Sequence, residues 1–301
     1  MVVRVLTWNL FHGRDRAPDP ALHTWRSRLF RVTERGETHA QVNRDLFKRF
    51  TELLGGSSWD IALLQECPPR WAGALAGECQ AEPHLILTSR NLPPPLPHLQ
   101  GWIARVSPDL IASWEGGSNL TLIRGIEAAG PIVERRRSLT LARSPETRRM
   151  AFTRLLSGVC VANLHASGAR TAAEREVGEA AGVALGWAEG SPLILGGDLN
   201  LRPETSPALY AELAELGFVG SPLAGSIDQL LGHRLELLEP PEAWPAAARE
   251  LPDPTAREQS DALPIRLSDH APVQARFRVA GPAQPGRSQP TDHRRELSPP
   301  G

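Results

Sequence analysis

Short apolar runs, separated by turn-forming residues, recur along most of this chain. Seven of them have the length and the Val, Ile, Leu and Phe content that are typical of strands. These runs are Val2–Leu10, Ile61–Leu64, Asn119–Ile123, Met150–Leu156, Val159–Leu164, Leu193–Leu195 and Val273–Val279. Some runs follow one another directly and others are separated by helical patterns, so we predict mixed β-sheets with helices outside them.

Three segments repeat their apolar residues with helical spacing. They are Gln41–Leu54, Thr171–Gly190 and Ser206–Gly217. The first is followed by Gly55, a natural helix stop, and the second opens with Thr171 and Glu174 in the spacing of a capping box. Pro207 suits the first turn of the third helix.

The pattern indicates one domain over residues 1–280 and a tail after it. Residues 281–301 are rich in Pro, Gly, Ser and charged residues, and we expect this tail to be disordered. Residues 13–39 are charged and weakly patterned, and we predict that they form a surface insertion near the functional site.

Composition removes several classes of protein. The formal net charge of −1 provides no overall basic field for non-specific binding of nucleic acid. Lys48 is the only lysine, which excludes a GK[ST] phosphate loop and Schiff-base chemistry. The three cysteines form no CxxC pattern, and no segment has the length of a membrane span. We therefore expect a soluble, cytoplasmic monomer without membrane contact.

Polar side chains stand where several of the apolar runs end. They are Asn9, Glu66, His165, Asp198 with Asn200, Asp228, and Asp269 with His270. One such ending is ordinary, because strands commonly stop at polar turn residues. Six endings of this composition indicate that the strand ends meet at one rim and form a site there.

The residue types suggest the chemistry of that site. Glu66 and Asp269 offer hard oxygen ligands and Asn9 a neutral one, a set that suits Mg²⁺ or Mn²⁺ rather than structural zinc. Strand periodicity would place Asp198 and Asn200 on one face, where the carboxylate can accept a proton from water and the amide can donate to a phosphoryl oxygen.

Neighbouring residues could orient these groups. Asp228 could fix the tautomer of His270 through a carboxylate–imidazole hydrogen bond. Gly196 and Gly197 could let the backbone approach a bound group closely. His12 lies near Asn9 and could reach the site, but we favour its interpretation as a surface-loop histidine.

The ordered motifs TWN, LLQE, NLH, GGDLN, IDQLL and SDH resemble those of the endonuclease/exonuclease/phosphatase superfamily, which includes deoxyribonuclease I and the abasic-site endonucleases. They extend from Thr7 to His270. The resemblance implies an α/β fold, a four-layer sandwich of two packed mixed β-sheets flanked by helices, with residues 1–280 as its catalytic domain. It also implies a phosphoesterase that depends on Mg²⁺ or Mn²⁺.

The resemblance assigns roles to individual residues. Glu66 would be the principal metal ligand, with Asn9 and Asp269 close to the ion. Asp198 would position or deprotonate the attacking water, and Asn200 would bind the scissile phosphate. His270, held by Asp228, would stabilise the transition state, and His165 would act as an acid or a phosphate donor.

Some positions stay open. Arg148 and Arg149 both match a substrate-binding arginine of the family. Asn119 could hydrogen-bond His165 or the substrate, or it could simply be a turn residue at a strand entry. Phe11 stands where abasic-site endonucleases carry an acidic residue, and Asp15 is a candidate substitute.

The substrate is a phosphoester, and a nucleic acid is one candidate partner. A nuclease or related phosphodiesterase that uses in-line attack of water is the leading hypothesis. The alternatives are a phosphomonoesterase acting on lipid or inositol phosphates, and a non-catalytic binding protein with this fold. The first alternative lacks an evident membrane anchor or lysine clamps, and the second would normally have lost some of the acidic residues.

Overall fold

A computed structural model describes residues 1–30, 32–89, 91, 96–106, 116–125, 132–220, 222–256 and 262–279. The predicted disordered tail lies outside these residues. No helix in the described part of the chain is long and apolar enough to cross a membrane.

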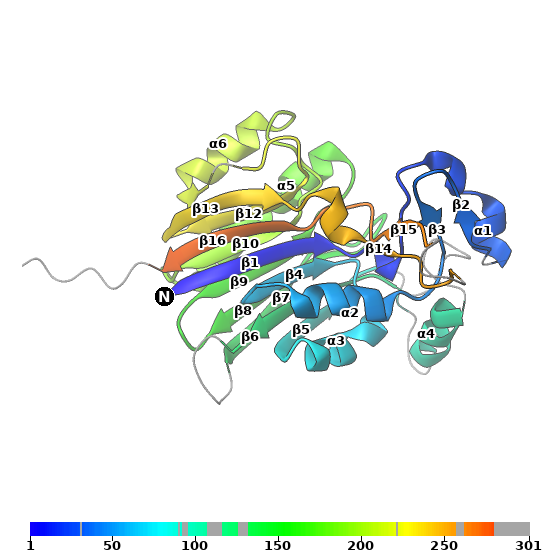
Figure 1. Cartoon of the computed structure of the whole chain (residues 1–301). Coiled ribbons are helices and arrows are strands. Elements are labelled where there is room, and N and C mark those ends of the chain that lie inside the picture. The colour runs from blue at the N-terminus through cyan, green and yellow to red at the C-terminus, as the bar shows by residue number, and fades with distance from the viewer. Residues whose placement is uncertain are drawn as a thin grey trace, which may run out of the picture.

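Two six-stranded sheets form the centre of the fold (Figure 1). The first sheet has the order β13 (Leu235–Ala243), β16 (Val273–Val279), β1 (Val2–Asn9), β4 (Ile61–Gln65), β6 (Ser118–Arg124) and β5 (Ala81–Leu87). The second has the order β11 (Phe218–Val219), β12 (Asp228–His233), β10 (Leu193–Asp198), β9 (Cys160–His165), β8 (Arg148–Leu155) and β7 (Val133–Ala142). The pairs β1–β4 and β9–β10 are parallel and the remaining pairs antiparallel, so both sheets are mixed, as predicted.

Helices cover the outer faces of both sheets and complete four layers (Figure 1). The covering helices are α2 (Phe47–Gly56), α3 (Ala72–Glu78), α5 (Arg170–Ala188) and α6 (Pro207–Glu215), whereas α1 (Trp25–Phe30) and α4 (Pro97–Val106) lie beyond one end of the sheets. Apolar residues of α2 and α3 pack against the first sheet, and those of α5 and α6 against the second. The predicted four-layer α/β sandwich is confirmed.

Alternation along β1 shows how the sequence makes the layers. Val3 and Val5 point between the two sheets, where they pack against apolar residues of both. Leu6 and Trp8 belong instead to the core under α2 and α3. Because successive side chains of a strand point to opposite faces, a continuous apolar run supplies both cores.

Two predicted helix starts are wrong. The segment expected to be helical from Gln41 begins as β3 (Ala40–Gln41), and α2 starts only at Phe47. The buried carboxylate of Asp15 accepts hydrogen bonds from the Val42 and Asn43 backbone amides at 2.6 and 3.1 Å. These two amides therefore bond Asp15 and do not take part in a helix.

The predicted capping box at Thr171 is also absent. The helix α5 begins one residue earlier, at Arg170, and its N-cap is Ala169, which makes no side-chain capping bond. Packing of the apolar face of α5 on the second sheet therefore fixes where this helix starts.

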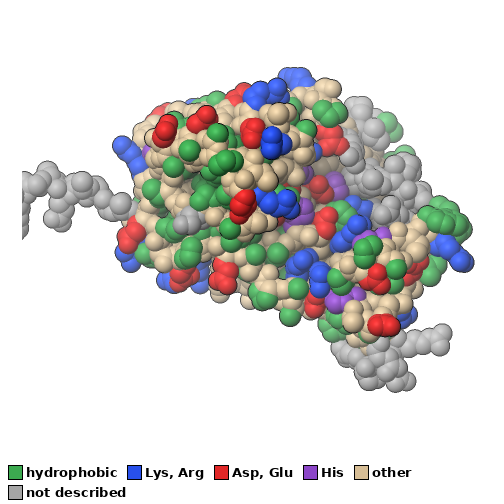
Figure 2. Space-filling view, turned by 90° about the horizontal axis from the view of Figure 1, so that it is seen from above, with side chains coloured by type: hydrophobic (Ala, Val, Ile, Leu, Met, Phe, Trp, Pro, Cys, Tyr) green, Lys and Arg blue, Asp and Glu red, His purple; other side chains and the backbone are tan. Residues whose placement is uncertain are grey.

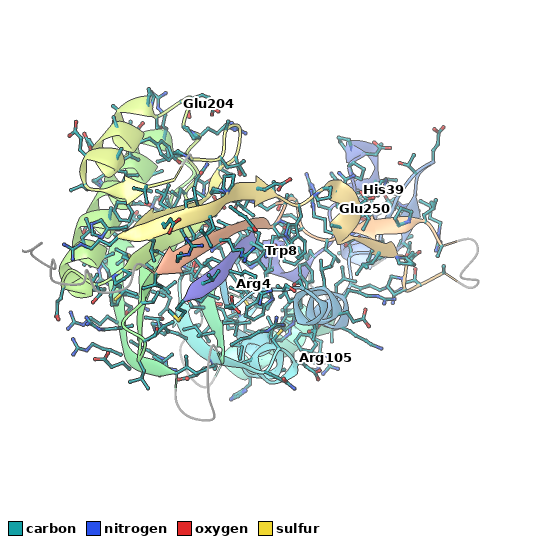
Figure 3. All side chains as sticks on the ribbon, turned by 60° about the vertical axis from the view of Figure 1, so that its left-hand side comes forward. Arg4, Trp8, His39, Arg105, Glu204 and Glu250 are labelled. Atoms are coloured by element: carbon teal, nitrogen blue, oxygen red, sulfur yellow. The ribbon has the colours of Figure 1, made fainter. Side chains whose placement is uncertain are left out.

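Residues 13–39 form the expected surface insertion, at the end of the molecule that carries the short sheets β2 (Glu34–Arg35)–β3 and β14 (Glu250–Pro252)–β15 (Pro264–Arg266) (Figure 1). An isolated bridge joins Asp15 to Leu267. At the far end of the insertion, His39 Nε2 lies 3.0 Å from a carboxylate oxygen of Glu250 (Figure 3). The insertion is thus attached to the segment that leads into Asp269 and His270.

Candidate active site

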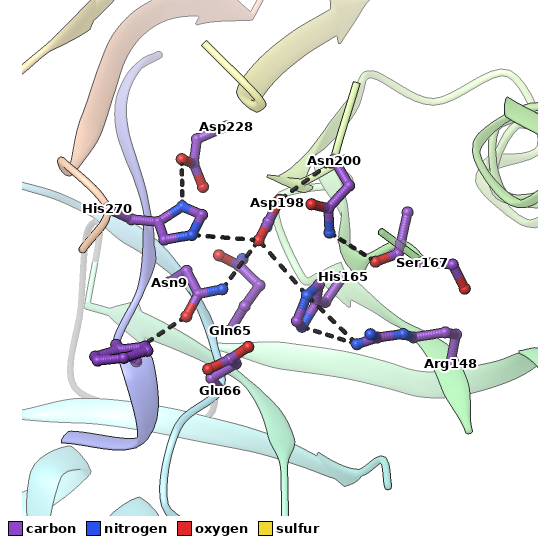
Figure 4. A network of polar contacts seen from close by, with 12 residues as sticks. Asn9, Gln65, Glu66, Arg148, His165, Ser167, Asp198, Asn200, Asp228 and His270 are labelled. Carbon is purple, nitrogen blue, oxygen red and sulfur yellow. Dashed lines mark hydrogen bonds and ion pairs between the residues drawn. The ribbon is translucent and has the colours of Figure 1, made fainter. Parts of the chain in front are cut away.

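Strand pairing brings the predicted polar strand ends together. The parallel pair β1–β4 places Asn9 beside Gln65, so Glu66 follows directly. In the second sheet Asp198 pairs with His165 of β9 on one side and with Asp228 of β12 on the other. The site therefore has one half from each sheet (Figure 4).

The carboxylate of Asp198 is the hub of the site. Its Oδ2 accepts a hydrogen bond from Asn9 Nδ2 at 2.9 Å and lies 3.5 Å from His165 Nε2 and 3.8 Å from His270 Nε2. Its Oδ1 accepts from the backbone amide of Asn200 at 3.0 Å. Burial and the charge of Asp228 raise the pKa of Asp198 to about 7, against the opposing effect of His270 and the two asparagines.

His270 is held by Asp228, as predicted from the sequence. Its Nδ1 lies 2.8 Å from Asp228 Oδ2. Burial lowers the pKa of His270, but the hydrogen bond and charge of Asp228, with the charges of Asp198 and Asp269, raise it more, to about 10. The ring is consequently an imidazolium at neutral pH, and its Nε2–H points towards Asp198 (Figure 4).

His165, unlike His270, is uncharged. Burial and the nearby Arg148 guanidinium hold the pKa of His165 well below its usual range, so the ring is neutral. Arg148 Nη1 lies 3.3 Å from both ring nitrogens, and Nη2 donates to Glu146 at 2.9 Å. Arg148 is therefore the arginine at the site. The guanidinium of Arg149 donates instead to Leu87 O and to Ser138 Oγ.

The side chains of Asn200 and Asn119 donate to backbone carbonyls, whereas the side chain of Asn9 donates to Asp198. β10 ends at Asp198, and Asn200 has a left-handed φ of 53°, so strand periodicity does not bring the two side chains to one face. The side-chain amide of Asn200 donates to Ala166 O at 2.9 Å. Asn119 is buried and its side-chain amide donates to Arg149 O at 2.9 Å, so within the described part of the chain it does not hydrogen-bond His165.

Close packing against the neighbouring strands explains why residues 196 and 197 are glycines, and the sequence did not show this. A Cβ on Gly197, whose φ is 138°, would lie 1.9 Å from Leu164 O of the neighbouring strand. A Cβ on Gly196 would lie 2.6 Å from Leu230 Cδ2. The close approach is therefore to β9 and β12, and not to a bound group.

Glu66, Asn9 and Asp269 form a set of oxygen donors that fits a divalent cation. Burial and the charge of the Asp269 carboxylate raise the pKa of Glu66, so the two acidic side chains lie close enough to interact. Glu66 has a left-handed φ of 46°, an uncommon conformation that is often found at functional sites. Hard oxygen donors of this kind suit Mg²⁺ or Mn²⁺.

A second group of possible ligands lies close by. Atoms of Asp198, Asp228 and His270 are all within 4.8 Å of one another. His270 Nδ1 is already bonded to Asp228. The described residues thus offer two groups of possible ligands, one around Glu66 and one around Asp198 and His270.

Two residues near Glu66 depart from the sequence-based interpretation. His12 is no surface-loop histidine, because its side chain is only 13% exposed and its Nε2 lies 3.2 Å from Glu66 Oε2. Asp15 is fully buried and its carboxylate accepts the Val42 and Asn43 amides, so it does not take the place of an acidic residue at Phe11. No periodic pattern covers either position, because both residues lie after the end of β1.

On the surface, histidine side chains gather with acidic and basic ones in a hollow of one face (Figure 2). Exposed Trp25 and Phe30 on α1 and exposed Trp102 on α4 are large apolar side chains that the sequence did not single out as anchors. Trp25 and Phe30 contact each other, with ring centroids 6.1 Å apart.

No family model matches the sequence, and no curated protein is similar to it. Solved structures do match. An endonuclease/exonuclease/phosphatase family protein from Bacteroides thetaiotaomicron is 12% identical over 92% of this chain and 97% of its own, with a TM-score of 0.57. A mannosyl-6-phosphatase from the same bacterium is 13% identical over 91% and 99%, also with a TM-score of 0.57. TDP2 from Caenorhabditis elegans is 15% identical over 92% and 74%, with a TM-score of 0.50.

At these identities the likeness establishes the fold. This chain therefore has the fold of the endonuclease/exonuclease/phosphatase proteins, as the resemblance of its motifs implied.

Proposed function

We propose that this chain is a phosphoesterase that depends on Mg²⁺ or Mn²⁺, and that it hydrolyses a phosphodiester as a nuclease or a related phosphodiesterase. One observation carries the proposal: the buried Asp198 carboxylate lies between Asn9, His165 and the His270–Asp228 pair. Such a site combines a base with fixed hydrogen-bond donors, which hydrolysis of a phosphoester requires.

Asp198, His270 and His165 have different roles because their charge states differ. Asp198 accepts the proton of the attacking water, and its pKa of about 7 suits a general base at neutral pH. The imidazolium of His270 donates to a phosphoryl oxygen as negative charge builds up there. Neutral His165 and the cation of Arg148 present further donors on the opposite side of Asp198.

Glu66, with Asn9 and Asp269, would hold the divalent cation. When bound, the cation supplies positive charge that polarises the phosphoryl group and stabilises the transition state. Asn9 connects the two halves of the site, because its side chain donates to Asp198 and lies close enough to Glu66 to lower the pKa of that carboxylate. The base and the cation are thereby kept in a fixed relation.

The phosphodiester preference rests on His165 and Arg148. A neutral histidine and an arginine opposite His270 would provide donors on two sides of a bound phosphate. Mannosyl-6-phosphatase has the same fold, so a phosphomonoesterase is the alternative that an assay must distinguish.

The test compares a phosphodiester, bis-(p-nitrophenyl) phosphate, with the matching monoester. Purified protein is assayed with Mg²⁺, Mn²⁺ or a chelator, together with Glu66→Ala and, as a control, Glu52→Ala, which changes an exposed glutamate on α2. We expect chelator-sensitive cleavage of the diester that only Glu66→Ala loses. Faster cleavage of the monoester would favour a phosphatase, and no cleavage of either by folded, metal-supplied protein would favour a binding protein.

A further inference from the structure

His12 is fixed next to Glu66 by the backbone. Its amide donates to the carbonyl of Glu66 at 3.1 Å, which links the turn after β1 to the turn after β4. Both residues have left-handed φ angles, 53° for His12 and 46° for Glu66. Strained backbone of this kind persists only where the surrounding structure holds it, and it is often found at ligand sites.

The side chain of His12 also lies next to Glu66. Its Nε2 lies 3.2 Å from Glu66 Oε2, and the two side chains are only 13% and 24% exposed. The ring lies against Gly117, where an added Cβ would be 3.9 Å from His12 Cε1. An imidazole nitrogen is therefore held beside the carboxylate that heads the metal-binding set.

We propose that His12 provides a nitrogen ligand to the cation bound by Glu66, so that this site selects Mn²⁺ or a similar first-row metal over Mg²⁺. This inference rests on the proposed function. Imidazole is a borderline ligand that transition metals accept readily, whereas Mg²⁺ prefers carboxylate, carbonyl and water oxygens. A site with only Glu66, Asn9 and Asp269 would lack this preference.

Two roles are open to this nitrogen. It binds the cation together with Glu66, or it only forms an ion pair with the Glu66 carboxylate.

The two roles predict opposite effects of removing His12. If His12 is a ligand, its loss weakens the binding of Mn²⁺. If His12 is instead an ion-pair partner that competes with the cation for Glu66, its loss strengthens binding. The best variants are His12→Asn and His12→Gly, because Asn and Gly tolerate the left-handed conformation better than other residues.

Isothermal titration with Mn²⁺ and with Mg²⁺ measures the preference directly. We expect both His12 variants to bind Mn²⁺ about 10–100-fold more weakly, a range typical of lost support at metal sites, while Mg²⁺ affinity changes less than about 3-fold. His98→Asn, which changes an exposed histidine on α4, is the control and leaves both affinities unchanged.

Pulsed electron paramagnetic resonance of bound Mn²⁺ gives an independent readout. We expect nitrogen coupling in the wild type and in His98→Asn, and none in His12→Gly. Wild-type Mn²⁺ without nitrogen coupling, or a His12 variant that binds Mn²⁺ as tightly as the wild type, would overturn the assignment of His12.

Glu66→Gln separates this inference from the proposed function. If the wild type binds both metals and Glu66→Gln weakens both, the metal site stands and only the role of His12 is judged by its variants. If Glu66→Gln leaves both affinities unchanged, the proposed metal site itself is wrong, and the His12 assignment fails with it.

Discussion

The buried side chain of Asp198 interacts with several charged and polar groups at once. It lies beside a second carboxylate, an imidazolium and a neutral imidazole, and burial keeps these interactions strong. His270 is charged and His165 is neutral, because Asp228 bonds the His270 ring whereas Arg148 lies against the His165 ring. The sequence alone does not show these contacts.

Replacing Asp198 by Asn should remove the general base. The amide oxygen can still accept from the Asn200 backbone, but the side chain cannot take a proton from water, so we expect kcat to fall by ~100-fold or more. The melting temperature should also fall, because the new amide nitrogen faces the Asn9 donor, and kcat is compared at a temperature where both proteins are folded. The control, Asp60→Asn, alters a carboxylate that pairs with Arg4 on the surface. A variant that retains more than a tenth of wild-type kcat contradicts the role of Asp198.

Asp15 gives a pH dependence of stability. Burial raises its pKa from 3.8 to about 6, although two backbone amides bond the charged form. Between about pH 4 and pH 6 the unfolded chain has lost this proton and the folded protein still holds it. The contribution of Asp15 to the free energy of unfolding therefore decreases as pH rises through this window, by at most about 3 kcal/mol.

Urea denaturation of the wild type and Asp15→Asn at pH 4.5 and pH 7 tests this sign. The wild type should lose more stability than the variant as pH rises, although the variant starts about 1–2 kcal/mol lower because one amide loses a good acceptor. Asp45→Asn is the control for removing a partly exposed carboxylate. Equal pH dependence of the wild type and Asp15→Asn would mean that Asp15 does not retain its proton.

At the scale of elements, the predicted strands are those with neighbours on both sides. All seven apolar runs correspond to observed strands, at β1, β4, β6, β8, β9, β10 and β16. Of the missed strands of the two large sheets, β5, β7, β11 and β13 lie at the edges, and only β12 lies inside, between β10 and β11. Edge strands are half solvated and need no continuous apolar run. β7 contains three consecutive arginines, and β13 contains two prolines and shifts its register twice.

The same distinction explains the site. The last residues of central strands, such as Asn9, His165 and Asp198, were predictable from the pattern, because the apolar run shows where the strand ends. His12 and Asn200 were not placed correctly, since left-handed turns determine their directions and no periodicity carries over into a turn.

Gly197 within β10 provides a test of close strand packing. Gly197→Ala should lower the free energy of unfolding by more than ~3 kcal/mol, because the new methyl group meets Leu164 O and φ is unfavourable for alanine. Gly182→Ala, in the middle of α5 with nothing within 4 Å, should instead raise it by up to about 1 kcal/mol. Chemical denaturation of both variants measures the contrast. A loss below 1 kcal/mol for Gly197→Ala would show that β9 and β10 can separate at this point.

At the scale of the whole molecule, the site depends on how the two sheets are aligned. Asn9 and Glu66 belong to the first sheet, whereas His165 and Asp198 belong to the second. Directly below them, a buried polar network joins the sheets: Gln65 Nε2 donates to Asn163 Oδ1 at 2.8 Å. Asn163 in turn donates to Leu120 O at 3.2 Å. Hydrogen bonds require a defined geometry, so this network can fix the relative position of the sheets better than apolar packing alone.

Removing one partner of this network should therefore affect both stability and catalysis. Asn163→Leu leaves the Gln65 amide and the Leu120 carbonyl with fewer partners in the core, and we expect a loss of about 2–4 kcal/mol. Gln65→Leu should cost a similar amount. The double variant should lose less than the sum, because two apolar side chains then face each other and fewer polar groups stay unsatisfied.

Catalysis distinguishes alignment from mere stability. A shift of about 1 Å between the two halves of the site can cost ~100-fold in rate, so the double variant should regain stability but not kcat. Denaturation and phosphoester hydrolysis, measured on all four members of the cycle at a temperature where each is folded, separate the two effects. If kcat recovers together with stability in the double variant, apolar contacts between the sheets suffice to align the site, and the Gln65–Asn163 pair only satisfies buried polar groups.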